Sequence, residues 1–128
     1  MEYFRTGTEW EPLVGYSRAV KVGQVIHVSG TTATDEQGGI VGHNNIYAQT
    51  LQCLKNIERA LQYFDCDLQS VYRTRIYVTN IDLWRDVGRA HAEVFSGDHK
   101  PASAMVEVQR LIADEILVEI EAEAYWEF

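Results

Sequence analysis

The segment ILVEIEAEAYW, residues 116–126, alternates apolar and mostly acidic side chains with a period of two. This alternation is typical of a β-strand, because successive side chains of a strand point to opposite faces of the sheet. One face of such a strand is apolar and has to be covered, whereas the other is acidic and has to stay in polar surroundings. The chain is therefore predicted to form a sheet with one face buried under other elements.

The remaining segments supply the partners of that strand. Alternation in RAVKV and QVIHVSG predicts a hairpin that turns at Gly23, and two further segments alternate in the same way. Apolar residues at helical spacing predict two helices, the first capped by Asn44 or Asn45 and the second by Asp82. The predicted strands cover 18–22, 24–30, 70–79, 102–109 and 116–126, and the predicted helices cover 47–64 and 83–95. The order β-β-α-β-α-β-β predicts an α+β fold, a single mixed sheet with two helices on one face.

Strand alternation also divides the side chains between the two faces of the sheet. The set expected beneath the helices takes every second residue of the ranges 26–28, 72–78, 104–108 and 116–124. The opposite set mixes arginines, tyrosines and carboxylates: His27, Ser29, Arg73, Arg75, Tyr77, Ser103, Met105, Glu107, Leu117, Glu119, Glu121, Glu123 and Tyr125. Such a surface suits an interface in a symmetric homo-oligomer, and a solvated face with cross-strand ion pairs is the alternative.

Length and charge narrow the classes of protein. A chain of 128 residues fits one domain, residues 1–128. Its net charge of −8 argues against nucleic acid as the main partner. No segment is long and apolar enough to act as a signal sequence or to cross a bilayer, so no membrane partner is expected. Cys53 and Cys66 are interpreted as free thiols of a cytoplasmic protein.

Few side chains carry a recognisable chemical motif. Ser29 and Ser103 have no base at a usable spacing, so a structural role is favoured over a nucleophilic one. His91 lies on the apolar stripe of the second helix, together with Trp84, Val87 and Val94. The default for that position is a buried, hydrogen-bonded histidine, with catalysis as the alternative. The histidines and cysteines lack metal-ligand spacing and no phosphate-binding loop is present, so neither a metal nor a cofactor is expected.

Glu119 is the most promising acid or base. It lies on the mixed face of the last strand, where partial burial would raise its pKa and allow it to handle a water or a proton. Glu119, Glu121 and Glu123 form one row, however. Pairing with an arginine is the ordinary fate of such carboxylates, and it remains the alternative.

Several segments, in order along nearly the whole chain, resemble the RidA/YjgF (Rid) family: GYSRAVKVGQVIHVSGTTA, the helix from Asn45, VYRTRIYVTNID, HAEVF, KPASAMVEVQRL and LVEIEAEAY. The resemblance implies a chorismate-mutase-like fold and a homotrimeric barrel with three ligand clefts between subunits. It also implies hydrolysis of enamines and imines such as 2-aminoacrylate to a 2-oxo acid and ammonia, without a cofactor. Tyr16 would border the ligand, Ser29 and Gly30 would lie at the strand end, and Glu119 would orient the attacking water.

The main departure of the sequence from the family pattern lies directly after Pro101 and Ala102. RidA deaminases carry an arginine directly after the P-A pair, and here that position is Ser103. Loss of such a carboxylate clamp is expected to cost about 3 kcal/mol or more of binding free energy. Many relatives also have cysteine where this chain has Met105 and asparagine where it has Gly88. Ser103 is therefore predicted to help determine the pocket with Gly88, His91 and Met105, and His91 is a candidate replacement donor.

The sequence thus predicts a protein that binds a small-molecule metabolite between subunits and acts as an enamine or imine deaminase with an altered substrate range. The missing arginine argues against 2-aminoacrylate as the substrate. A non-catalytic ligand-binding sensor or chaperone-like trimer is the alternative. The endoribonuclease or translation-inhibitor activity also attached to the family is disfavoured, because the chain is acidic and lacks a paired-histidine site.

Overall fold

A computed structural model describes residues 1–127. Six strands form one sheet in the order β1-β2-β3-β6-β4-β5, in which β4 and β5 are parallel and every other neighbouring pair is antiparallel. The strands are β1 Glu2–Phe4, β2 Ala19–Val22, β3 Val25–Thr31, β4 Val71–Val78, β5 Ala102–Glu107 and β6 Val118–Tyr125. The predicted single mixed sheet is confirmed, and the alternating segment at the C-terminus is one of its central strands.

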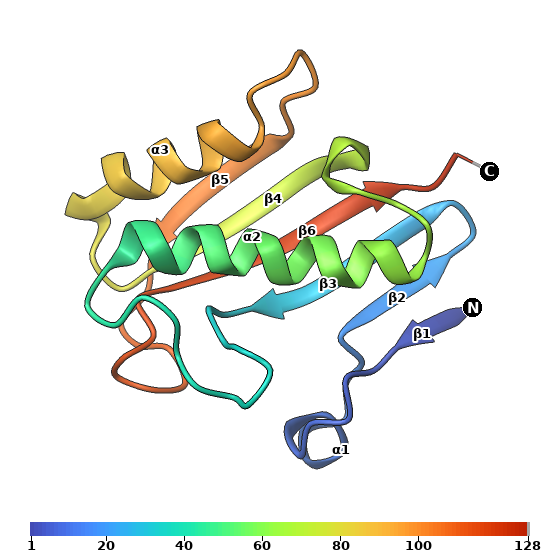
Figure 1. Cartoon of the computed structure of the whole chain (residues 1–128), viewed down its shortest axis with the longest axis horizontal. Coiled ribbons are helices and arrows are strands. Elements are labelled where there is room, and N and C mark those ends of the chain that lie inside the picture. The colour runs from blue at the N-terminus through green and yellow to red at the C-terminus, as the bar shows by residue number, and fades with distance from the viewer. Residues whose placement is uncertain (128) are drawn as a thin grey trace.

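Two long helices cover one face of this sheet, as predicted (Figure 1). They are α2, Ile46–Tyr63, and α3, Trp84–Val94. The strand β1, the short helix α1, Trp10–Val14, and the 3-10 turns η1, Leu68–Ser70, and η2, Ile81–Leu83, were not predicted. Each of these elements has at most five residues, too few to show a periodic pattern.

The predicted cap of α2 is confirmed, and that of α3 is wrong. The backbone N–H of Ala48 donates to the side-chain oxygen of Asn45, which supplies the acceptor that the first turn of a helix needs. Asp82 lies instead inside η2, where its own N–H donates to the side chain of Asn80. The extra 3-10 turn shifts the start of α3 beyond the reach of Asp82, and Leu83 precedes the helix.

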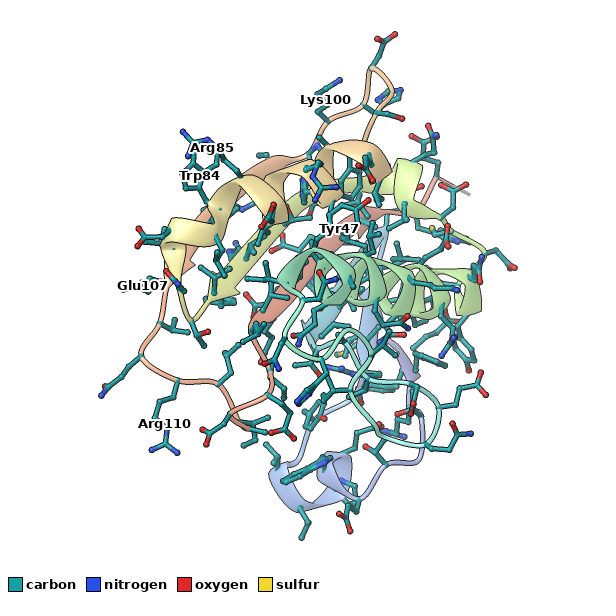
Figure 2. All side chains as sticks on the ribbon, turned by 60° about the vertical axis from the view of Figure 1, so that its left-hand side comes forward. Tyr47, Trp84, Arg85, Lys100, Glu107 and Arg110 are labelled. Atoms are coloured by element: carbon teal, nitrogen blue, oxygen red, sulfur yellow. The ribbon has the colours of Figure 1, made fainter. Side chains whose placement is uncertain are left out.

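The core lies between the helices and the sheet. Leu54, Ile57 and Leu61 of α2 are fully buried against Val118 and Ile120 of β6. The predicted apolar stripe of α3 is right for Val87, whereas Trp84 is 47% exposed and its ring stacks with the Arg85 guanidinium at the outer end of the helix (Figure 2). Cys53 and Cys66 are buried free thiols. None of the helices within residues 1–127 is long and apolar enough to span a membrane.

A buried amide ties the loops at one end of the sheet to α2. Gln49 has no exposed surface, and its side-chain nitrogen donates to the carbonyls of Gly42 and Glu115 at 3.2 and 2.9 Å. Its side-chain oxygen accepts from the N–H of Leu117 at 2.9 Å. A buried polar group is tolerated when its hydrogen bonds are satisfied in this way. Gln49 therefore fixes the loop that leads into β6, the strand that carries Glu119.

The predicted division of faces is right for β6 and wrong for β5. In the parallel pairing with β4, Ser103 lies beside Thr74 and Met105 beside Ile76, and both of these β4 residues are buried under the helices. Glu107 reaches the same side, because it accepts a hydrogen bond from the N–H of Ile81 in η2. Ser103, Met105 and Glu107 thus face the helices, whereas Ala104 and Val106 face the open side. Apolar residues occur on both faces of this strand, Ala104 and Val106 on one and Met105 on the other, so the sequence pattern did not show which face is buried.

Tyr72 is a second error of face. It was expected under the helices, yet it is exposed and its hydroxyl donates to Glu123 on the open face. The cause is an irregularity in the β4–β6 ladder, where the register shifts between Val71 and Arg73. Because an extra residue in one strand exchanges the inward-facing and outward-facing positions on one side of the bulge, strict alternation of faces fails there.

Candidate functional site

The open face is the face of the sheet that α2 and α3 do not cover. It carries Glu119, Glu121 and Glu123 of β6, and these three carboxylates have different surroundings. Glu123 forms an ion pair with Arg75. Glu121 accepts a hydrogen bond from the Tyr77 hydroxyl at 2.7 Å. Within residues 1–127, Glu119 accepts no hydrogen bond and makes no ion pair. Pairing with arginine, the ordinary fate of such carboxylates, therefore holds for Glu123 and not for Glu119.

Glu119 is also the member of the row whose protonation is perturbed by burial. It is half-buried, and desolvation raises the pKa of its carboxyl group above the ordinary value, although the nearby Arg18 cation acts in the opposite direction. A carboxyl group with a raised pKa can both take up and release a proton closer to neutral pH. The arrangement is suited to a general acid or base.

The strand end beside Glu119 is irregular. The β3–β6 ladder shifts its register between Val28 and Thr31, at the position of Ser29 and Gly30. A Cβ atom on Gly30 would overlap the Glu119 carboxylate, so the missing side chain makes the room that this carboxylate occupies. The Ser29 hydroxyl donates to the carbonyl of Ser17 at 2.7 Å, which supports the structural role expected for this serine.

Arg18 is a cation that sequence analysis did not select. Its Nη2 donates to the Gly30 carbonyl at 2.6 Å, and its guanidinium lies 5.4 Å from the ring centroid of Tyr16. The buried Nε atom of Arg18 has no acceptor among the described residues. Tyr16 and Ser29 also line an open hollow of about 790 Å³ between the N-terminal segment and β2. The structure thus gathers Tyr16, Arg18, Gly30 and Glu119 into one group, which we call the Glu119 group.

A second group lies on the helix side of the edge strand β5. The hydroxyl of Thr74 donates to Ser103 Oγ at 2.7 Å and also lies 3.0 Å from His91 Nε2. The imidazole of His91 packs against the Phe95 ring, and burial lowers its pKa. The sequence favoured a buried, hydrogen-bonded histidine at this position, and the structure shows one that is within hydrogen-bond distance of Thr74 but only half-buried. We call Thr74, His91 and Ser103 the Ser103 group.

Gly88 and Met105 flank the Ser103 group. Gly88 precedes His91 by three residues in α3, and a Cβ atom on it would meet nothing within 4 Å. Met105 follows Ser103 by two residues on the same face of β5 and packs against the core. Thr74 was missed in the sequence because a lone threonine in a strand is normally a packing residue.

The two groups do not meet within one chain. Glu119 is paired in register with Tyr77 on the open face, whereas Ser103 is paired with Thr74 on the helix side. β4 and β6 also separate β3, which carries Gly30, from the edge strand β5. A pocket that uses both groups therefore requires residues from two copies of the chain. Within residues 1–127 no three His, Cys, Asp or Glu side chains are grouped closely enough to hold a metal ion.

The chain is similar to proteins of one family along nearly its whole length. The sequence model of the family described as Endoribonuclease L-PSP matches residues 6–126. A RutC family protein of Pyrococcus horikoshii is 35% identical over 117 residues, which cover 91% of this chain and 91% of that protein. A mouse protein named 2-iminobutanoate/2-iminopropanoate deaminase is 30% identical over 96 residues, 75% of this chain and 70% of that protein.

The fold agrees with the sequence matches. A crystal structure of a member of the YjgF/YER057c/UK114 family from Mycobacterium tuberculosis is 46% identical. The match covers 97% of this chain and 98% of that one, with a TM-score of 0.87. The RidA-like fold expected from the resemblance is thus confirmed. On these grounds the chain belongs to the RidA/YjgF family, whose matching sequence model is described as endoribonuclease L-PSP.

Proposed function

We propose that this protein hydrolyses an enamine or imine to a carbonyl compound and ammonia, with Glu119 positioning the attacking water. The observation that carries the proposal is the unpaired, half-buried Glu119 carboxylate, whose pKa burial raises. The other carboxylates in its row are held by Arg75 and Tyr77. The mouse relative named as an imine deaminase supports this class of reaction.

The chemistry consumes one water, both of whose protons pass from oxygen to nitrogen through Glu119. The water oxygen adds to the carbon of the C=N bond while Glu119 accepts a proton from that water and passes it to the nitrogen, which gives a carbinolamine. Glu119 then accepts the proton of the carbinol hydroxyl and passes it to the amine nitrogen as the C–N bond breaks, so the carbonyl forms and ammonia leaves. An enamine enters the same path after its β-carbon takes up a proton and its nitrogen loses one, which gives the imine. No metal or redox cofactor is needed to balance these steps.

The proposed site lies between subunits of a homotrimer. The separation of the Glu119 group from the Ser103 group supports this, because a cleft lined by both needs two copies of the chain. The open face, rich in arginine and tyrosine, would line the centre of the trimer. The buried free thiols support a reducing compartment, and we place the protein in the cytoplasm.

The test is release of ammonia from imines formed in situ. An amino-acid oxidase supplies imines with a carboxylate, and an amine oxidase supplies imines without one. The expected result is hydrolysis of at least one class faster than in buffer alone, by protein that sediments as a trimer. If the purified protein accelerates neither class, the catalytic proposal is wrong.

A non-catalytic ligand-binding role is the second candidate. It is favoured by the Ser103 group, which offers hydroxyls and a half-buried imidazole but no cation to bind a carboxylate. A ligand that raises the melting temperature strongly without being turned over would support this role. Turnover of the same ligand would exclude it.

A further inference from the structure

Three side chains from three elements form a continuous hydrogen-bonded chain that ends at the protein surface. His91 of α3 is half-buried, Thr74 of β4 is fully buried, and Ser103 of β5 is exposed. Thr74 Oγ1 is 3.0 Å from His91 Nε2 and 2.7 Å from Ser103 Oγ. The chain thus leads from the imidazole through one hydroxyl to a second hydroxyl at the edge of the sheet.

The directions of the hydrogen bonds follow from the number of protons. The Thr74 hydroxyl has one hydrogen, and when it donates to Ser103 the Nε2–H of His91 must donate to Thr74. The hydroxyl hydrogen of Ser103 then has no acceptor among the described residues. The reverse order, from Ser103 through Thr74 to an unprotonated Nε2, is equally consistent. The outer hydroxyl can therefore donate to a ligand in one direction and accept from it in the other.

The outer end of this hydrogen-bonded chain, the Ser103 hydroxyl, carries no charge. Burial holds the pKa of His91 below its ordinary value, so the imidazole is neutral at physiological pH. The arginines of β4, Arg73 and Arg75, are paired in register with Glu123 and Glu121 of the open face, on the other side of the sheet. A carboxylate at Ser103 would receive a hydrogen bond from one neutral hydroxyl, and no cationic side chain of residues 1–127 is hydrogen-bonded to Ser103, so its hydration would be poorly replaced.

The backbone of α3 borders open space at Gly88, close in sequence to His91. A side chain at Gly88 would meet no atom within 4 Å, and Gly88 lies one turn before His91 in α3. Met105 supplies an apolar wall two residues beyond Ser103. A small polar head group would therefore meet a hydroxyl next to an apolar contact.

We propose that Ser103, Thr74 and His91 form a recognition unit for an uncharged polar group of the ligand, such as an amide, carbonyl or hydroxyl. Ser103 contacts that group, whereas Thr74 and His91 are positioning residues that set the direction of its hydroxyl. The inference rests on the proposed function, since it places this unit at one end of the same cleft. It narrows the substrate class to imines without a carboxylate at the Ser103 end.

The probes are butyramide and butyrate, which have similar size and differ in charge. Full-length protein labelled with ¹⁵N-histidine is titrated with each and followed by NMR. Butyramide is expected to shift the His91 imidazole signals and to bind at least about tenfold more tightly than butyrate, as expected for one well-placed hydrogen bond without a charge penalty. Equal or tighter binding of butyrate, or no response of His91 to butyramide, would overturn the proposal.

Variants separate the unit from the rest of the pocket. Thr74→Val keeps the shape but removes the central hydroxyl, so it should weaken butyramide about five- to tenfold, leave butyrate unchanged and abolish the His91 response. The matched control is Thr50→Val, another fully buried threonine, whose hydroxyl donates within α2 to Ile46. If Thr74→Val fails to fold, Ser103→Ala at the exposed end provides the same comparison. An unchanged preference for butyramide in the folded variant would count against the proposal.

Ammonia release measured in parallel distinguishes the two proposals. Hydrolysis with a preference for butyrate would leave the proposed function standing and overturn the recognition unit. Selective binding of butyramide without hydrolysis of any imine would support the unit and remove the catalytic role.

Discussion

The carboxylate of Glu119 occupies the space that a side chain at Gly30 would need. A Cβ atom on Gly30 would lie 3.0 Å from the carboxyl carbon of Glu119 and overlap one of its oxygens. Gly30 also gives its carbonyl to the Arg18 guanidinium. The orientation of the candidate acid or base therefore depends on a glycine in the adjacent strand.

Gly30→Ala should impair the site more than the fold. The added methyl group meets only the end of a flexible side chain, so Glu119 can turn away without a large loss of stability. A displaced catalytic group of this kind costs roughly 100-fold in rate, measured here as ammonia release. The control is Gly97→Ala in an exposed loop, where the new Cβ would meet nothing within 4 Å. Full activity of Gly30→Ala would show that the position of Glu119 does not matter.

Glu119→Gln should abolish hydrolysis while preserving the shape of the site. Loss of a general acid or base typically lowers the rate about 10²- to 10⁴-fold, and kcat is expected to fall with little change in KM. Glu121→Gln is the matched control in the same row, because a glutamine oxygen can still accept the hydrogen bond from Tyr77. Equal rates for the two variants would remove Glu119 from the mechanism.

The same variant has a pH signature in stability. Burial raises the pKa of Glu119 in the folded protein, so the folded state binds its proton more tightly than the unfolded state does. The stabilising contribution is complete below the ordinary glutamate pKa and is lost as the pH rises through the folded value. Glu119→Gln should therefore become more stable relative to the wild type as the pH rises from about 4 to neutrality. Urea unfolding at a series of pH values measures this difference, and a constant difference would contradict it.

Sequence periodicity was sufficient to predict the architecture, because a long helix or strand repeats the spacing of its apolar residues several times. The strand β6 and the helix α2 each show their buried face over several repeats, and both were predicted correctly. β5 gave no such signal, because Ala104 and Val106 are as apolar as Met105 on the other face. The face of β5 is set by its parallel pairing with β4, a tertiary contact that no local pattern contains.

The candidate site was predictable only in part for the same reason. The acidic row drew attention to Glu119, but its lack of a partner depends on how Arg75 and Tyr77 align with Glu123 and Glu121 across the β4–β6 ladder. Thr74 became a candidate only when its two hydrogen bonds were known. Residue type indicates possible chemistry, whereas the surroundings determine which of several similar side chains is available.

Arg75→Glu should disrupt assembly if the open face is the centre of a trimer. The change removes the ion pair with Glu123 and places three carboxylates side by side on a surface that assembly would bury. Sedimentation velocity should show a shift from trimer to monomer. Arg59→Glu is the control, because Arg59 forms an exposed ion pair with Glu36 on the opposite side of the molecule. A trimeric Arg75→Glu protein would place the interface elsewhere.

Gln49→Ala should be among the most destabilising single substitutions in this chain. It leaves the Glu115 carbonyl and the N–H of Leu117 without partners, removes one of the two donors to the Gly42 carbonyl, and also opens a cavity beneath α2. Unsatisfied buried groups and lost packing together predict a decrease of about 3 kcal/mol or more in the free energy of unfolding. The exposed Gln62→Ala in the same helix should change it little. The midpoints of urea denaturation give both values.

His91 should make stability fall in mildly acidic solution. Burial lowers its pKa in the folded protein, so between the folded value and the ordinary value near 6.5 the unfolded state binds more protons. Its contribution to stability is therefore complete above that ordinary value and is lost as the pH falls toward the folded value. His91→Gln should remove this dependence between about pH 7 and pH 5, whereas the exposed His99→Gln should retain it. Parallel curves for wild type and His91→Gln would mean that the imidazole is as free to accept a proton in the fold as in the unfolded chain.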